Sequence, residues 1–336
     1  ATYISRQTGN WSAASTWLTA ASGTLGPTAN AGQAPQSSGG DKIIINNGYT
    51  ITYDVSGEFG DQTSTYSTGN WGIATTTSII SSNAIILSGG ILKASRTTNT
   101  SLSCRGTLVI GASSSFDWGT DADPLSGVTS TITLNTYVTS VTFPASAAKG
   151  YSGIYFYGTQ STGSPIYYNN NFYFNGLQKT RNTYLTVSAV SGATTISVND
   201  SSNWQIGDKL IIGTSYTFLP SAINTNSGPL SSTFITGITG NNIGISQGLN
   251  TAKDALTRVG NFTSNITVKS YDISNQSFGI YCIIDYGTNV IHKNVKFENI
   301  GGTGWNPYAT SMGNASVTYL LTYRSEEHTS ELQSRV

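Results

Sequence analysis

Charge is scarce in this sequence. Lys, Arg, Asp and Glu make up only 10% of the 336 residues, and 16 basic side chains balance 16 acidic ones. Phosphate binding needs a clustered excess of Lys and Arg, so this composition argues against a nucleic-acid partner. It also argues against a polybasic membrane anchor. No apolar run approaches the ~20 residues of a membrane-spanning helix, so we expect no membrane span.

Cysteines and recognisable catalytic motifs are also rare. The chain has two cysteines, Cys104 and Cys282, and the sequence leaves open whether they pair or are two buried thiols. It holds no metal-ligand spacing, phosphate loop, Ser-His-Asp order or dinucleotide fingerprint, which counts against phosphoryl transfer and redox chemistry. The chain opens at Ala1 without an initiator Met or a signal peptide, so we expect a processed protein or a fragment.

Short apolar runs between small polar residues are what the sequence does contain. Aromatic residues make up 11% of the chain, with 19 Tyr, and there are 37 Gly. Disordered chains lack such apolar content. Runs such as "DKIIINNGYTITYD", "NAIILSGGILKAS" and "STITLNTYVTSVTF" are strand-sized and end at Gly, Asn, Ser or Asp. We predict an all-β fold.

Two all-β architectures suit this pattern, an antiparallel sandwich and a β-solenoid. We favour a right-handed parallel β-helix, because Gly-containing corners precede branched apolar strands in successive segments. A sandwich would show more Asn-Gly or Asp-Gly hairpins. One such pair, Asn47-Gly48, predicts a local hairpin.

The middle of the chain is unusually aromatic. The stretch "GIYFYGTQSTGSPIYYNNNFYFNG" predicts a hairpin insertion with rings on both faces. Such rings can stack on sugars, pack a subunit interface or fill a core, and the sequence leaves all three open. The candidate carbohydrate-binding residues are Trp118, Tyr155, Tyr157, Tyr167, Tyr168 and Tyr173.

The N-terminal segment carries a recognisable motif. "TGNWSAASTWL" is followed by "GDKIIINNGYTITYD", and this order resembles the opening of the eight-glycine domain family, which includes fibrocystin-type surface proteins and cell-surface hyaluronidases. The resemblance implies an eight-glycine β domain over residues 1–125, before a β insertion over 126–185 and parallel β-helix coils over 186–323. The stretch "SFGIYCIID" holds no histidine, so the resemblance carries over a fold and no catalysis. The motif positions are Gly9, Trp11, Trp17, Gly40, Asp41 and Gly48.

A second segment, "NWQIGDKLII", resembles the region that follows this domain in larger members of the family. Its physical interpretation does not depend on the family. Trp204 would fill an interior, Gly207 would permit a tight corner and Asp208 would cap backbone N–H groups. We expect these roles to be structural.

An acidic loop and a lone histidine are the candidates for chemistry. Asp117, Asp121 and Asp123 surround Trp118, and three alternatives stay open: a solvated turn, a calcium site, and acid–base cleavage of a glycoside. Calcium is the only cofactor that we consider. His292 shares one face of a predicted strand with Asn294 and Lys296, so it would point outward as a candidate catalytic residue.

The last thirteen residues differ in composition from the rest. "RSEEHTSELQSRV" resembles a translated sequencing-library adapter, so residues 324–336, including His328, are excluded from functional reasoning. We expect the natural protein to continue past Tyr323.

The function that we expect is that of an extracellular, cell-surface or virion β-solenoid. It would present a surface that binds polysaccharides or cell-surface glycans, or one that associates into a homo-oligomer. One alternative is a polysaccharide hydrolase or lyase of the hyaluronidase-like branch, with Asp117, Asp121, Asp123 and His292 as its residues. The other is a purely structural stalk.

Overall fold

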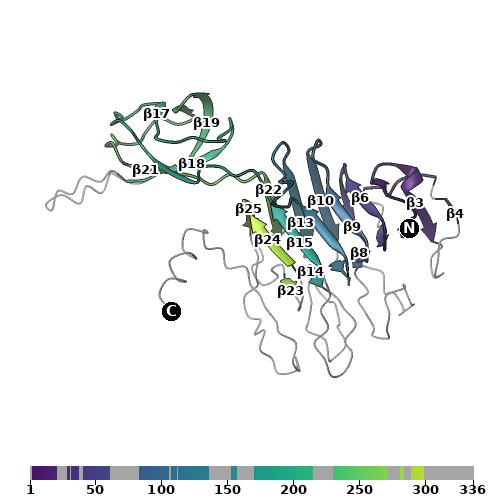
Figure 1. The fold of residues 1–336 in the computed structure, drawn as a ribbon. Coiled ribbons are helices and arrows are strands. Elements are labelled where there is room, and N and C mark those ends of the chain that lie inside the picture. Colours follow the sequence, from purple (N-terminus) through teal and green to yellow (C-terminus); the bar gives the residue numbers. More distant parts are fainter. Residues whose placement is uncertain are drawn as a thin grey trace, which may run out of the picture. The chain divides into compact units, whose positions relative to one another are not determined.

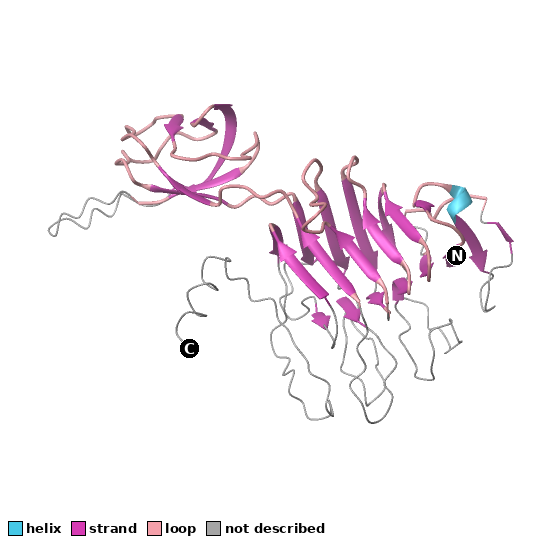
Figure 2. Cartoon of the chain, in the orientation of Figure 1, coloured by secondary structure: helices cyan, strands magenta, loops and turns pink. Residues whose placement is uncertain are grey.

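The computed structural model consists almost entirely of strands, which confirms the all-β class (Figure 2). Within the described part of the chain, the only helical element is the 3-10 turn η1 (Ala14–Thr16). No helix among these residues is long and apolar enough to cross a membrane. The structure describes residues 2–20, 29–30, 32–37, 41–60, 83–105, 107–111, 113–135, 153–156, 170–214, 230–270, 281–283 and 289–298. The adapter-like tail, 324–336, lies outside these ranges.

The chain forms two compact units. Unit 1 comprises Ala1–Gly176 and Asn265–Val336, and unit 2 comprises Leu177–Ser264. Unit 2 is therefore an insertion between two strands of unit 1. This differs from the predicted boundaries at 125 and 185, which cut through unit 1 and unit 2 respectively.

Three sheets make up unit 1. In spatial order, sheet A contains β23 (Tyr281–Ile283), β14 (Gly153–Phe156), β11 (Thr107–Ile110), β8 (Asn83–Ser88), β5 (Lys42–Asn46), β1 (Thr2–Ser5), β3 (Trp17–Ala20) and β4 (Ala29–Asn30). Sheet B contains β2 (Gly9–Asn10), β6 (Thr50–Tyr53), β9 (Ile91–Ala94), β12 (Ser115–Trp118), β15 (Asn171–Asn175) and β24 (Asn289–Lys293). Sheet C contains β25 (Val295–Glu298), β22 (Ile266–Ser270), β13 (Ser130–Asn135), β10 (Thr100–Arg105) and β7 (Ser56–Phe59).

From β5 on, the strands of unit 1 visit these sheets in strict rotation. β5, β6 and β7 lie in sheets A, B and C, and the next three strands, β8, β9 and β10, repeat that order. Every pairing in sheets B and C is parallel, and in sheet A only β1–β3 and β3–β4 are antiparallel. Figure 1 shows β6, β9, β15 and β24 side by side, and β10, β13, β22 and β25 likewise.

Neither predicted hairpin of unit 1 is present. β5 and β6 flank Asn47-Gly48 but lie in different sheets, and Gly48 (φ +84°) forms the corner between them. The other hairpin was predicted to turn at Asn169–Asn171, but β15, which would be its second strand, pairs in parallel with β12 on one side and β24 on the other. The same turn chemistry serves a hairpin and a corner between two sheets, because both redirect the chain through a positive φ.

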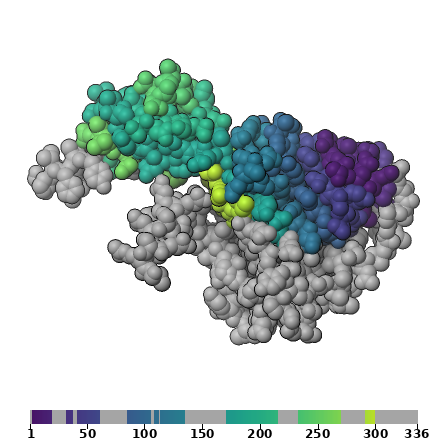
Figure 3. Space-filling model, viewed as in Figure 1, coloured from purple at the N-terminus to yellow at the C-terminus, as the bar shows by residue number. Residues whose placement is uncertain are grey.

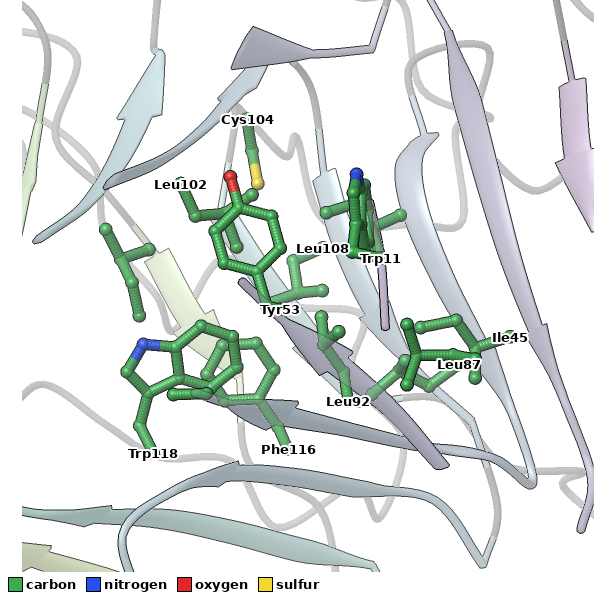
Figure 4. Packing of buried hydrophobic residues seen from close by; sticks show 14 of the residues in the cluster. Trp11, Ile45, Tyr53, Leu87, Leu92, Leu102, Cys104, Leu108, Phe116 and Trp118 are labelled. Carbon is green, nitrogen blue, oxygen red and sulfur yellow. The ribbon is translucent and has the colours of Figure 1, made fainter. Parts of the chain in front are cut away.

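Inward-facing side chains stack between the three sheets of unit 1. Along sheet B, Leu92, Phe116 and Phe172 are paired in register and all are buried. The Phe116 and Trp118 rings are stacked with their centroids 4.0 Å apart. Figure 4 shows how these rings, Tyr53, Trp11 and the aliphatic side chains of other strands meet in one core.

Unit 2 has a different construction. Its strands lie in the order β16 (Asn182–Tyr184), β21 (Arg258–Asn261), β18 (Lys209–Ile212), β19 (Leu230–Thr239), β20 (Asn242–Ile245) and β17 (Thr195–Ser197). All of their pairings are antiparallel, and a bridge between Leu185 and Val198 joins the two ends, so the six strands close on themselves. The unit forms one rounded body in the space-filling view (Figure 3).

The antiparallel pairing of unit 2 corrects a prediction. Parallel coils were expected throughout 186–323, yet the strands within Leu177–Ser264 are antiparallel and parallel pairing resumes at β22. A strand with one buried face shows the same alternation in either arrangement, so the pattern in "NWQIGDKLII" could not distinguish them.

Candidate functional site

The outer face of sheet B carries a row of polar side chains in register. Lys93 of β9 pairs with Asp117 of β12, which pairs with Tyr173 of β15. Their neighbours along each strand face the core, so these three side chains point outward. The Tyr173 hydroxyl donates a hydrogen bond to Oδ1 of Asn171, 2.8 Å away, which fixes the ring at this surface.

Arg96 holds two of the predicted aspartates together. Its Nη2 lies 2.8 Å from Asp117 Oδ1, and its Nε lies 3.1 Å from Asp123 Oδ2. Lys93 Nζ approaches the same Asp123 oxygen at 3.0 Å. The hydrogen bond from Lys93, together with the charge of Arg96, holds the pKa of Asp123 below its ordinary value. Asp123 therefore stays ionised and is poorly suited to act as a general acid.

The third aspartate is linked to a different strand. Asp121 Oδ1 accepts hydrogen bonds from Lys293 Nζ at 2.9 Å and from Asn175 Nδ2 at 3.1 Å. Lys293 belongs to β24 and Asn175 to β15, so Asp121 connects the loop after β12 to two later strands. We call the set Lys93, Arg96, Asp117, Asp121, Asp123, Tyr173 and Lys293 the sheet B polar face.

The three aspartates do not form a calcium site. Each has a basic partner within 3.1 Å, and the described residues contain no group of three His, Cys, Asp or Glu side chains that could hold a metal ion. Asp117 and Asp123 approach a common guanidinium and Asp123 also contacts Lys93, so the two negative charges that a cation would neutralise are already balanced by Arg96 and Lys93.

Trp118 is not available to stack on a sugar. Its side chain is fully buried in the core of unit 1, and Nε1 donates to Ser130 Oγ at 2.8 Å. The prediction placed it beside the aspartates because they are adjacent in sequence. On a strand, however, Trp118 and Asp117 point to opposite faces.

His292 also faces inward, contrary to the prediction. Its ring lies 4.9 Å from the Phe172 ring and 5.6 Å from the Phe297 ring, centroid to centroid. Burial lowers the pKa of His292 to about 4, and its buried Nε2 has no hydrogen-bond partner among the residues that the structure describes. The expected row with Asn294 and Lys296 fails because Asn294 (φ +54°) is a corner between β24 and β25. A catalytic role for His292 is therefore not supported.

Four of the five predicted carbohydrate-binding tyrosines have no described side chain. Tyr157, Tyr167 and Tyr168 lie outside the described residues. For Tyr155 only the backbone is described, within β14. Tyr173 alone among the candidate tyrosines has a described side chain at an outer face.

The N-terminal motif residues lie in or beside the core. Trp11 and Trp17 are fully buried, and Trp17 Nε1 donates to the Trp11 carbonyl at 2.9 Å. A Cβ atom on Gly9 would lie 2.6 Å from Thr16 Oγ1, so a side chain has no room there. Asp41 Oδ2 accepts the backbone N–H of Gln36 at 2.9 Å. Gly40 lies outside the described residues.

The second motif builds the core of unit 2. Trp204 is buried and its Nε1 donates to the Thr180 carbonyl at 2.7 Å, while Gly207 has φ +90°. Asp208 Oδ2 accepts the backbone N–H of Gln205 at 2.9 Å, and Oδ1 lies 2.6 Å from Lys179 Nζ. Both charged side chains are almost fully buried, so this ion pair is internal.

The sequence interpretation missed one exposed surface. On the outside of unit 2, Lys209 pairs with Phe234, and the Phe262 N–H donates to the Lys209 carbonyl. Both rings are about half exposed. The sequence "DKLII" shows that polar Lys209 precedes an apolar strand. It does not show that Phe234 and Phe262 flank Lys209, because those contacts join segments far apart in the chain.

The structure describes the environment of one of the two cysteines. Cys104 is a free thiol in the core of unit 1, where burial raises its pKa to about 12. The side chain of Cys282 is not described.

Comparison with known proteins identifies no relative: no family model matches this chain, and neither a curated protein nor a solved structure matches it.

Proposed function

We propose that unit 1 is a parallel β-helix, and that its N-terminal part is an eight-glycine-like domain. The rotation of successive strands through sheets A, B and C supports the solenoid. The burial of Trp11 and Trp17 and the positive φ of Gly48 agree with structural roles for the motif that suggested the family.

The function that we propose is that of a rigid scaffold, at a cell or virion surface, that contacts glycans through the sheet B polar face. The observation that carries this proposal is the fixed row Lys93–Asp117–Tyr173, with Arg96 bonded to both neighbouring aspartates. Sugars are recognised by polar groups held in place beside an aromatic ring, because little conformational entropy is then lost on binding.

Affinity electrophoresis in gels that contain neutral or acidic polysaccharides tests this proposal. The wild-type chain should be retarded, and Tyr173→Ala should remove most of the retardation. Thr131→Ala, a partly buried position on sheet C, is the matched control and should behave like wild type. Equal retardation of wild type and Tyr173→Ala would show that this face is not the glycan site.

A structural stalk is the second candidate. A stalk would use the aromatic segment to fill its core, and Phe172 and Phe174 of that segment are buried there. The hydrolase or lyase alternative has less support, because Asp123 is held ionised and His292 points into the core. The absence of retardation in every gel would favour the stalk.

A further inference from the structure

Exposed large hydrophobic side chains are confined to one unit. In the described part of the chain, all six of them belong to unit 2 and none to unit 1. They are Val187, Val190, Ile206, Phe234, Leu256 and Phe262. Scattered exposed apolar residues are normal, but their concentration on one small unit indicates an interaction surface.

Two of these residues, Phe234 and Phe262, lie on either side of one strand and are exposed. Phe234 on β19 and Phe262 after β21 flank Lys209 on the central strand β18, so the two rings lie on either side of the lysine. Gly260 leaves space for the second ring, since a Cβ atom there would lie 2.6 Å from Phe262 Cε2. Arg258 and Phe262 share this face, because alternate residues of an extended segment point to the same side. Leu256 is exposed in the turn that precedes β21.

Leu256 is held in an unfavourable backbone conformation. Its φ is +71°, although its side chain is 64% exposed and is not part of the core. Left-handed conformations are costly for leucine and persist mainly where surrounding structure imposes them, often at functional sites. We name Lys209, Phe234, Leu256, Arg258 and Phe262 the unit 2 ridge.

The ridge has a positive charge that the chain as a whole lacks. Lys209 and Arg258 are exposed, and unit 2 contains five basic and three acidic side chains. None of those acids, Asp200, Asp208 and Asp254, belongs to the ridge, and Asp208 is buried against Lys179. A chain with zero net charge therefore presents a local cationic surface.

We propose that the unit 2 ridge binds the surface of a lipid bilayer that contains anionic lipids. Its apolar members are phenyl and isobutyl groups without polar tips, which suits the acyl boundary better than sugar hydroxyls. The ridge lies on the outside of a closed ring of strands, so it is convex and can enter an interface but cannot enclose a ligand. Lys209 and Arg258 would place their charges at the headgroups while their aliphatic stems cover apolar surface.

Vesicle co-sedimentation of the full chain tests this proposal, with phosphatidylcholine vesicles that contain or lack phosphatidylglycerol. The wild type should bind the anionic vesicles. The double variant Lys209→Gln/Arg258→Gln should bind them roughly 30-fold more weakly, as expected for two basic residues near a charged surface. The double variant Phe234→Ser/Phe262→Ser should lose binding even at low salt. Both variants alter exposed side chains, so far-UV circular dichroism should be unchanged.

Lys296→Gln, which removes a half-exposed lysine of unit 1, is the matched charge control and should bind like wild type. Absence of wild-type binding at low salt would overturn the proposal, and so would equal binding by the Phe234→Ser/Phe262→Ser variant. Retention on a single-stranded oligonucleotide or a glycan that is lost in that same variant, without vesicle binding, would reassign the ridge to that partner. This inference is independent of the sheet B polar face, since Tyr173→Ala should leave vesicle binding intact.

Discussion

His292 illustrates how a single residue's environment decides its chemistry. The ring lies among Phe172, Phe174 and Phe297, and the charged residues of the neighbouring corner, Lys293 and Lys296, are on or near the surface. Burial in this apolar surrounding disfavours the imidazolium.

This burial predicts a stability change with pH. The ordinary pKa of histidine is 6.5 and that of folded His292 is about 4, so between these values the unfolded chain binds a proton that the folded chain does not. Stability should be complete above pH 6.5 and fall as the pH drops toward 4, by at most about 3 kcal/mol. Urea unfolding of wild type and His292→Leu at pH 7.5 and 4.5 measures this. Other groups titrate in the same range, so the quantity to compare is the loss of unfolding free energy between the two pH values. Wild type should lose more than His292→Leu, and an equal loss in both would contradict the prediction.

The internal ion pair of unit 2 gives a second prediction at this scale. Asp208 contacts Lys179 at 2.6 Å and also accepts hydrogen bonds from Asn261 and the Gln205 backbone. Removing one member of a buried pair leaves an uncompensated charge, so Asp208→Ala should destabilise unit 2 by about 3–5 kcal/mol. Backbone amides of unit 2 should then exchange hydrogen faster in the variant than in wild type, which hydrogen exchange measures. Asp200→Ala is the comparison and should cost less, because Asp200 is only partly buried and accepts hydrogen bonds from neutral groups of Thr180 and Ser202.

At the scale of the element, the corner residues between strands direct the chain from one sheet of unit 1 to the next. Gly48 joins β5 in sheet A to β6 in sheet B with φ +84°, a conformation that costs other residues roughly 1–2 kcal/mol. Gly48→Ala should therefore destabilise unit 1 by about 1 kcal/mol. Gly127→Ala is a suitable control, because Gly127 has no positive φ and its nearest atom to an added Cβ is 3.8 Å away. Thermal unfolding compares the two, and equal melting temperatures would argue against a strained corner.

At the scale of the whole molecule, the insertion leaves and re-enters unit 1 at one place. A Cβ atom on Gly176 would lie 2.5 Å from Asn265 Oδ1, and Asn265 Nδ2 donates to the carbonyls of Leu125 and Val128. The equivalent corner between β24 and β25 consists of Asn294 alone.

This closeness predicts that unit 2 can be removed. A chain in which Leu177–Ser264 is replaced by one asparagine should retain the β-sheet circular dichroism of unit 1 and a cooperative melting transition. As a control, an equal-length deletion that removes β12 and β13 should abolish the transition. Aggregation of the first variant under conditions where the full chain is soluble would show that unit 1 needs the insertion.

The sequence by itself determined that the chain is all-β, and it identified a corner residue, Gly207, and an interior residue, Trp204. Those properties are local: a positive φ favours glycine, and the large, mostly apolar ring of tryptophan favours burial. Only the tertiary structure decided that most strands in unit 1 pair in parallel, that Trp118 and His292 face inward, and that a separate antiparallel unit is inserted between β15 and β22. An alternating strand has the same pattern in every such arrangement, and in the described part of the chain its partners lie up to 136 residues away, as between Ser130 and Ile266. Short-range periodicity carries no record of these contacts.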